Sequence, residues 1–126
     1  MQEILVLHPR DTAYFDEDTL NALSRDLGPS VAENILCRAL EDIASRFHRI
    51  RDDYSSGNHD ALRKSVHALI PIADQIGLPI LARVGHDVMN TIDTGDSVAL
   101  AATLCRLVRC GEMAMSCAEM GLDLSL

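Results

Sequence analysis

Apolar residues recur every three or four positions along most of this chain, and that spacing constrains its fold more than any other feature. The clearest run has steps of four, four, four, four, three and four residues: Val31, Ile35, Ala39, Ile43, Phe47, Ile50 and Tyr54. Such spacing places the side chains on one face of an α-helix and would scatter them over both faces of a strand. The pattern therefore predicts one long amphipathic helix.

Glycine and proline mark where the helices begin and end. Asp16, Glu17 and Asp18 favour a helix start, because negative charge is stabilised at the amino terminus of a helix. Gly28 suits the position after the last turn of this short helix, and Pro29 suits the first turn of the long helix that follows.

A third helix follows the long one. Gly57 ends the long helix, and either Asn58 or Asp60 can cap the next. Its apolar residues are spaced by four, three, four and three positions, as in the seam of a helical bundle: Leu62, Val66, Leu69, Ala73 and Ile76. Gly77 ends this helix.

Two more helices complete the pattern. Pro79 begins the fourth, which places four apolar residues inward: Leu81, Val84, Val88 and Ile92. After Gly95 and the cap Asp96, the last helix runs from about residue 97 to residue 116 and is apolar around most of its circumference. Because short connections make neighbours antiparallel, we predict an all-α fold: an antiparallel up-down four-helix bundle with an additional short N-terminal helix. The bundle domain covers residues 16–120, after a lead-in of residues 1–15 and before a tail of residues 121–126.

Composition narrows the classes of function. A chain of 126 residues fits one domain, and it has a formal net charge of -8 and a pI near 4.9. This acidity argues against binding to nucleic acid or to an anionic membrane, since both need a basic face. No stretch approaches the roughly 20 apolar residues of a membrane span, and the start lacks the basic region of a signal peptide. We expect a soluble, cytoplasmic protein.

The cysteines show no metal-binding or redox spacing: Cys37, Cys105, Cys110 and Cys117. No pair is spaced C-x-x-C, and none lies at zinc-finger spacing from a histidine. Cys37 and Cys105 fall on apolar helical positions, where a free cysteine packs as a small hydrophobe. We therefore predict four reduced, structural cysteines, no organic cofactor and no tightly held metal ion.

Histidine is the residue type left to carry chemistry, because no nucleophile lies beside a base at readable spacing and no glycine-rich phosphate loop is present. His67 lies one position after Val66, about 100° around the helix from the seam, on the flank of the bundle. Its neighbours within one or two turns predict a partly cationic, partly apolar docking patch: Arg63, Lys64, Ile70, Pro71 and Asp74. The alternative is that His67 is an ordinary surface histidine with no function. We interpret His86 as such a surface histidine.

The segment that begins at His67 resembles the signature of histidine-containing phosphotransfer (HPt) domains. That signature is roughly H-x-L-K-G-x-A-x-x-I-G-x-x-x-L-A, and the chain matches it at seven positions: His67, Leu69, Ala73, Ile76, Gly77, Leu81 and Ala82. The preceding long helix and the turns at Gly57 and Gly95 also fall where the family has them.

The resemblance implies a phosphocarrier in a two-component phosphorelay rather than an enzyme. His67 would accept a phosphoryl group on its outer ring nitrogen from an aspartate of a response-regulator receiver domain and pass it on. The partners would be a receiver domain, a hybrid histidine kinase, or both, and the receiver would supply the magnesium ion. We expect a monomer; the alternative is a dimer contact through the last helix and the tail residues Met113, Met115, Met120 and Leu122.

Two positions depart from the family pattern. The family has lysine three residues after the histidine and glycine next, where this chain has Ile70 and Pro71. Proline inside a helix removes a hydrogen bond at a cost of about 3 kcal/mol, so we expect a kink at His67 and non-helical dihedrals at Ile70. Lys64 or Arg63 could replace the missing charge. The alternatives to an active phosphocarrier are a transfer-inactive HPt-like adaptor or inhibitor, which docks on a receiver or kinase, and an unrelated helical oligomerisation domain.

Overall fold

The computed structural model describes residues 15–125, with side chains described as far as Ala118. This part of the chain is all-helical and contains five helices and no strand: α3 (Glu17–Leu27), α4 (Pro29–Ser55), α5 (His59–Gln75), α6 (Pro79–Thr94) and α7 (Ser97–Ser125). The all-α prediction is confirmed. The lead-in lies outside the described residues, apart from Phe15.

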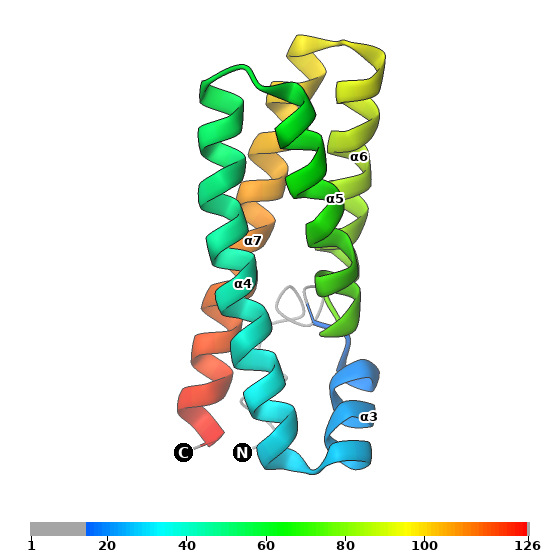
Figure 1. The fold of residues 1–126 in the computed structure, drawn as a ribbon. Coiled ribbons are helices and arrows are strands. Elements are labelled where there is room, and N and C mark those ends of the chain that lie inside the picture. The colour runs from blue at the N-terminus through cyan, green and yellow to red at the C-terminus, as the bar shows by residue number, and fades with distance from the viewer. Residues whose placement is uncertain (1–14, 126) are drawn as a thin grey trace.

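The four longer helices lie lengthwise beside one another, and each runs opposite to the one before it (Figure 1). Contacts join α4 to α5, α5 to α6 and α6 to α7, and a smaller contact joins α4 to α7. The short helix α3 packs against α4 and lies at the end where α5 gives way to α6 (Figure 1). This packing between adjacent helices is compatible with a bundle.

Polar side chains cap the helices at the predicted places. Asp16 accepts hydrogen bonds from the Asp18 amide at 3.2 Å and from the Thr19 hydroxyl at 2.7 Å, at the start of α3. Asp96 accepts one from the Ala99 amide at 3.0 Å, at the start of α7. The bonds from the Asp18 and Ala99 amides satisfy N–H groups that have no partner within the helix, which fixes where each helix begins.

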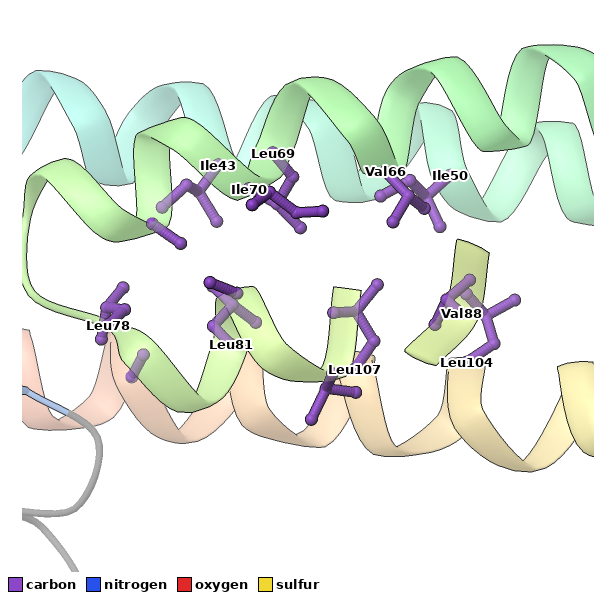
Figure 2. Packing of buried hydrophobic residues seen from close by; sticks show 14 of the residues in the cluster. Ile43, Ile50, Val66, Leu69, Ile70, Leu78, Leu81, Val88, Leu104 and Leu107 are labelled. Atoms are coloured by element: carbon purple, nitrogen blue, oxygen red, sulfur yellow. The ribbon is translucent and has the colours of Figure 1, made fainter. Parts of the chain in front are cut away.

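The core forms where the four longer helices face one another, and Figure 2 shows buried side chains meeting there. All five predicted inward residues that precede the turn at Gly77 are fully buried: Leu62, Val66, Leu69, Ala73 and Ile76. On the long helix, by contrast, the predicted stripe is wrong at its ends, because Val31 and Tyr54 are exposed. Helix α4 has 27 residues and α5 has 17, so α4 extends beyond α5 at the end that carries Val31. Tyr54 lies at the other end, next to the turn that leads into α5.

Helix α7 departs most from the prediction. It continues to Ser125 rather than ending near residue 116, since an isolated glycine such as Gly121 lowers helix stability without ending a helix. Cys105 is exposed, so its predicted burial is wrong. Its neighbour Leu104 faces the core instead. A helix that is apolar on most sides does not reveal from spacing alone which side will be covered.

Cys37, Cys105 and Cys110 are free thiols in the structure. Burial raises the pKa of the Cys110 thiol, although Arg106 and Arg109 oppose that effect. Among the described residues, no helix combines the length and the apolar character needed to cross a membrane.

Candidate functional site on helix α5

Helix α5 carries all the predicted site residues, and its cap and its buried side fix which side faces outward. Asn58, and not Asp60, caps the helix by accepting a hydrogen bond from the Ala61 amide at 3.1 Å. The buried residues occupy one side of the helix: Leu62, Val66, Leu69, Ile70 and Ala73. The opposite side is exposed along its length: Lys64, His67, Pro71, Asp74 and Gln75.

The turn after α5 is closed by a glycine that the geometry requires. Gly77 has a φ of 77°, and a Cβ at this position would lie 3.0 Å from the carbonyl oxygen of Asp16. The amide of Asp16 donates a hydrogen bond to the Gly77 carbonyl at 2.6 Å. Gly77 therefore joins the end of α5 to the start of α3, and a side chain would both strain the turn and separate the two.

His67 is exposed, as its position beside the seam predicts. The two flanks of α5 face different neighbours: the Ser65 hydroxyl donates to Asp53 of α4 at 3.4 Å, whereas Arg63 contacts α6. His67 follows Arg63 by one helical turn, so it lies on the flank that borders α6. Its imidazole can be reached from solvent beside the α5–α6 contact.

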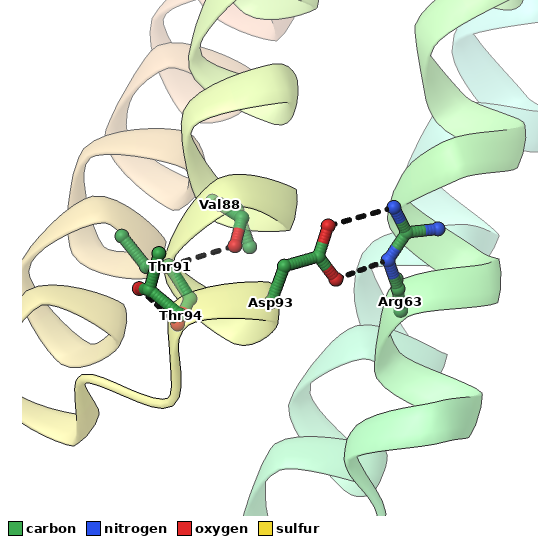
Figure 3. Close-up of polar contacts among 5 residues, drawn as sticks. All are labelled: Arg63, Val88, Thr91, Asp93 and Thr94. Atoms are coloured by element: carbon green, nitrogen blue, oxygen red, sulfur yellow. Dashed lines mark hydrogen bonds and ion pairs between the residues drawn. The ribbon is translucent and has the colours of Figure 1, made fainter.

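Arg63 is held by Asp93 of α6 in a two-point contact (Figure 3). Arg63 Nε donates to Asp93 Oδ1 at 2.7 Å, and Arg63 Nη2 donates to Asp93 Oδ2 at 2.9 Å. These bonds lower the pKa of the Asp93 carboxyl and raise the pKa of the Arg63 guanidinium. The two charges largely neutralise each other, so the positive charge predicted beside His67 is partly offset at Arg63.

Lys64 is the other basic residue one turn before His67. Its side chain is exposed, and it forms no ion pair with any residue that the structure describes. Pro71 and Asp74 are exposed as well, so these three residues lie with His67 on the outward side of α5. The structure thus brings together four of the six predicted site residues on one accessible surface.

Ile70 does not belong to that surface, and its predicted place in a docking patch is wrong. It is only 7% exposed and packs in the core (Figure 2). It follows Val66 by four residues and therefore lies on the seam side of α5. Gly85 of α6 makes room for it, since a Cβ there would lie 3.0 Å from Ile70 Cγ1.

Pro71 lies inside a continuous helix. The α-helix runs from His59 to Gln75 through Ile70 and Pro71, so the predicted non-helical conformation of Ile70 is wrong. Packing of Ile70 and of Ala73, two residues beyond the proline, holds the chain in the helix. Because Pro71 has no N–H, the carbonyl of His67 still lacks its usual helical hydrogen bond.

Sequence reasoning missed Asp93, the partner of Arg63. The two residues are thirty positions apart, and no local spacing connects them. Their pairing follows from the register between α5 and α6, which the structure alone supplies. His86, interpreted as a surface histidine, is exposed on α6.

A separate hollow lies between α4 and α7 and includes no residue of α5. It has a volume of about 170 Å³, and it is lined by Ala44, Phe47, His48, Arg51, Val108, Gly111, Glu112 and Met115. Within the described part of the chain, no three histidine, cysteine or acidic side chains lie close enough to hold a metal ion. Comparisons with models of protein families, with curated proteins and with solved structures found no match for this chain.

Proposed function

We propose that this chain is a histidine phosphotransfer domain and that His67 is its phosphoacceptor. In this proposal α4–α7 form an antiparallel up-down four-helix bundle with α3 as an additional N-terminal helix. The domain accepts a phosphoryl group from a receiver-domain aspartate and passes it on. Its partners are a receiver domain, a hybrid histidine kinase, or both.

One observation carries the proposal. Six of the seven residues that match the HPt signature are buried: Leu69, Ala73, Ile76, Gly77, Leu81 and Ala82. Packing and the tight turn account for those six residue types. His67 is the one exposed member, and packing gives no reason for a histidine there. A reactive group presented outward on a rigid helix fits a carrier that meets its partners from solution.

The chemistry needs little from this chain beyond an accessible ring and a suitable charge. The lone pair of His67 Nε2 attacks the phosphorus of an aspartyl phosphate, the bond from phosphorus to the aspartyl oxygen breaks, and the carboxylate leaves on the receiver. Imidazole acts as a nucleophile in its neutral form, which histidine commonly adopts near pH 7. Phosphoryl transfer depends mainly on positioning and on neutralising charge. The receiver brings the magnesium ion, and Lys64 provides positive charge from this side.

A second candidate is an adaptor or inhibitor that docks on a receiver or kinase without accepting phosphate. Two observations favour it: the family lysine position is the buried Ile70, and Arg63 is already paired with Asp93. Fewer cations then face the phosphoryl group than the family pattern supplies.

Transfer from a labelled receiver separates these candidates. The protein is incubated with a receiver domain that carries a radioactive aspartyl phosphate, and acid-labile, base-stable label on this chain is counted. We expect label on the wild type and on His86→Gln, a matched exposed histidine on the adjacent helix, and none on His67→Gln. Binding of the receiver without label would favour the adaptor, and label that persists in His67→Gln would refute the proposed acceptor.

A further inference from the structure

We infer that Arg63 exchanges its bond to Asp93 for a bond to the phosphoryl group when His67 is phosphorylated. Before phosphorylation, the positive charge that phosphohistidine needs is therefore paired with Asp93. This inference rests on the proposed function, because it concerns the same histidine. It adds a charge-supplying residue, Arg63, and a controlling partner, Asp93.

The position of Arg63 makes the exchange accessible. Side chains four residues apart on a helix have their Cβ atoms about 5–6 Å from each other, and Arg63 precedes His67 by four residues. Helical side chains lean toward the amino terminus, which brings the His67 ring toward the turn that carries Arg63. The Arg63 side chain is 41% exposed and that of Asp93 is 49% exposed, so neither is locked in place by packing.

The charges favour the exchange once phosphate is present. A phosphoryl group carries close to two negative charges near pH 7, against one on Asp93. Guanidinium binds a phosphoryl group with the same two-point geometry that it uses for a carboxylate. Exposed ion pairs are weak, so breaking the bond to Asp93 costs little. The stronger anion, one turn away, then competes successfully for the same donors.

The burial of Ile70 explains why phosphohistidine needs the positive charge of Arg63 in this chain. The position that carries lysine in the HPt signature points into the core against Gly85 and cannot supply charge. Lys64 alone offers one positive charge to a group that carries nearly two negative charges. Release of Arg63 supplies the second charge only after phosphorylation, and it also frees the Asp93 carboxylate on α6.

Nuclear magnetic resonance of the arginine side chains tests the exchange directly. Phosphoramidate phosphorylates the protein without a receiver: a ring nitrogen attacks phosphorus, the bond from phosphorus to the protonated amino group (–NH3+) of the reagent breaks, and ammonia leaves. We expect the Arg63 Nε–H signal, assigned by its loss in Arg63→Gln, to shift on phosphorylation of the wild type and to stay in place in treated His67→Gln. The Arg106 signal serves as an internal control, since Arg106 pairs with Asp87 at 3.5 Å between α6 and α7. An unmoved Arg63 signal in protein shown to carry phospho-His67 would overturn the inference.

The lifetime of phospho-His67 supplies a second, independent readout. Arg63→Gln should shorten the half-life about two- to fivefold, the range of an exposed charge interaction, whereas Asp93→Asn should change it little, because Asp93 no longer holds Arg63 once His67 is phosphorylated. The matched variant Arg106→Gln, which breaks the control pair, should leave the half-life unchanged. Equal half-lives in Arg63→Gln and Arg106→Gln would contradict the exchange. Phosphoramidate replaces the receiver, so the two proposals can fail separately. If a receiver still transfers phosphate to His67 but the Arg63 signal and the half-lives do not change as expected, only the exchange is refuted. If the exchange occurs but no receiver transfers phosphate, only the proposed function is refuted.

Discussion

The two sides of helix α5 differ in what the fold demands of them. The inward side is an unbroken series of buried apolar residues, among them Leu62, Val66 and Leu69, which are fully buried. The outward side carries Lys64, His67 and Pro71, all exposed. Stability accounts for every residue on the inward side and for none of these three. Pro71 even works against stability, since it removes a helical hydrogen bond. In the proposed function, the outward side is the one that meets the partner.

The largest expected effect lies on the inward side. Leu69→Ala removes a fully buried side chain from the core and should lower the free energy of unfolding by about 2–5 kcal/mol. Urea unfolding followed by circular dichroism measures this loss. His67→Gln, two positions away but exposed, is the control and should unfold like the wild type. Similar losses in both variants would show that the two sides are not distinct in packing.

Pro71→Ala should change stability in the opposite direction. Alanine restores the N–H that the His67 carbonyl lacks and favours the helix, so the free energy of unfolding should rise by as much as about 3 kcal/mol. Pro79→Ala is the matched control. Pro79 lies in the first turn of α6, where no helical bond is lost, so this variant should gain nothing. If Pro79→Ala raised the free energy of unfolding as much as Pro71→Ala, the missing hydrogen bond at Pro71 would not be the cause, and Pro71 would not destabilise α5.

Lys64→Ala should separate function from stability. We expect phosphoryl transfer from a receiver to slow about two- to fivefold, the range of one exposed charge interaction, while unfolding stays unchanged. Arg49→Ala removes an exposed cation from α4 and should leave the transfer rate as it is. Initial rates of labelling measure both variants. A rate for Lys64→Ala equal to the wild-type rate would exclude Lys64 from the site.

The smallest expected effect concerns the link between α5 and α6. Arg63 holds the pKa of Asp93 below its ordinary value of 3.8, so the pair stabilises the fold above about pH 4 and loses this contribution as pH falls through the lowered pKa. Asp93→Asn should therefore be less stable than the wild type at pH 7, and the difference should vanish in acid. Glu112→Gln breaks a single 3.6 Å contact with Arg51 and should show a smaller difference at pH 7. A difference for Asp93→Asn that persists unchanged at low pH would mean that its cause is not the ion pair.

Sequence periodicity predicted α5 far better than α7. On α5 the seam residues recur with a strict spacing, so the spacing assigned them all to the core and misplaced only Ile70, at the edge of the seam. On α7 nearly every side is apolar, and the spacing could not show that Leu104 is covered while Cys105 is exposed. The cap Asp96 was predictable because its bond is local, whereas the sequence left Asn58 and Asp60 open and the structure has Asn58 as the cap.

The same reasoning explains which parts of the site could be predicted. The exposure of His67 follows from its place one residue beyond the seam. Ile70 follows Val66 by four residues, so its seam position was also readable from the spacing, although the room for it comes from Gly85 of α6. The pairing of Arg63 depends on Asp93, which is also on a different helix. Contacts between helices depend on how the two helices are aligned with each other, and the spacing of residues within one helix does not predict that alignment. Local residues thus predicted where His67 lies, whereas the charges around it required the structure.

Nitrogen resonances of the histidine rings test the central claim most directly. The protein, labelled with nitrogen-15, is phosphorylated by a phosphorylated receiver domain, and the rings of His48, His59, His67 and His86 are followed in one sample. His8 is followed in the same sample, so that all five histidines of the chain are covered. We predict that the His67 ring alone gains a bond to phosphorus, at Nε2. Phosphorus on another ring, or a receiver that binds and loses its phosphate while every ring stays unmodified, would contradict the account.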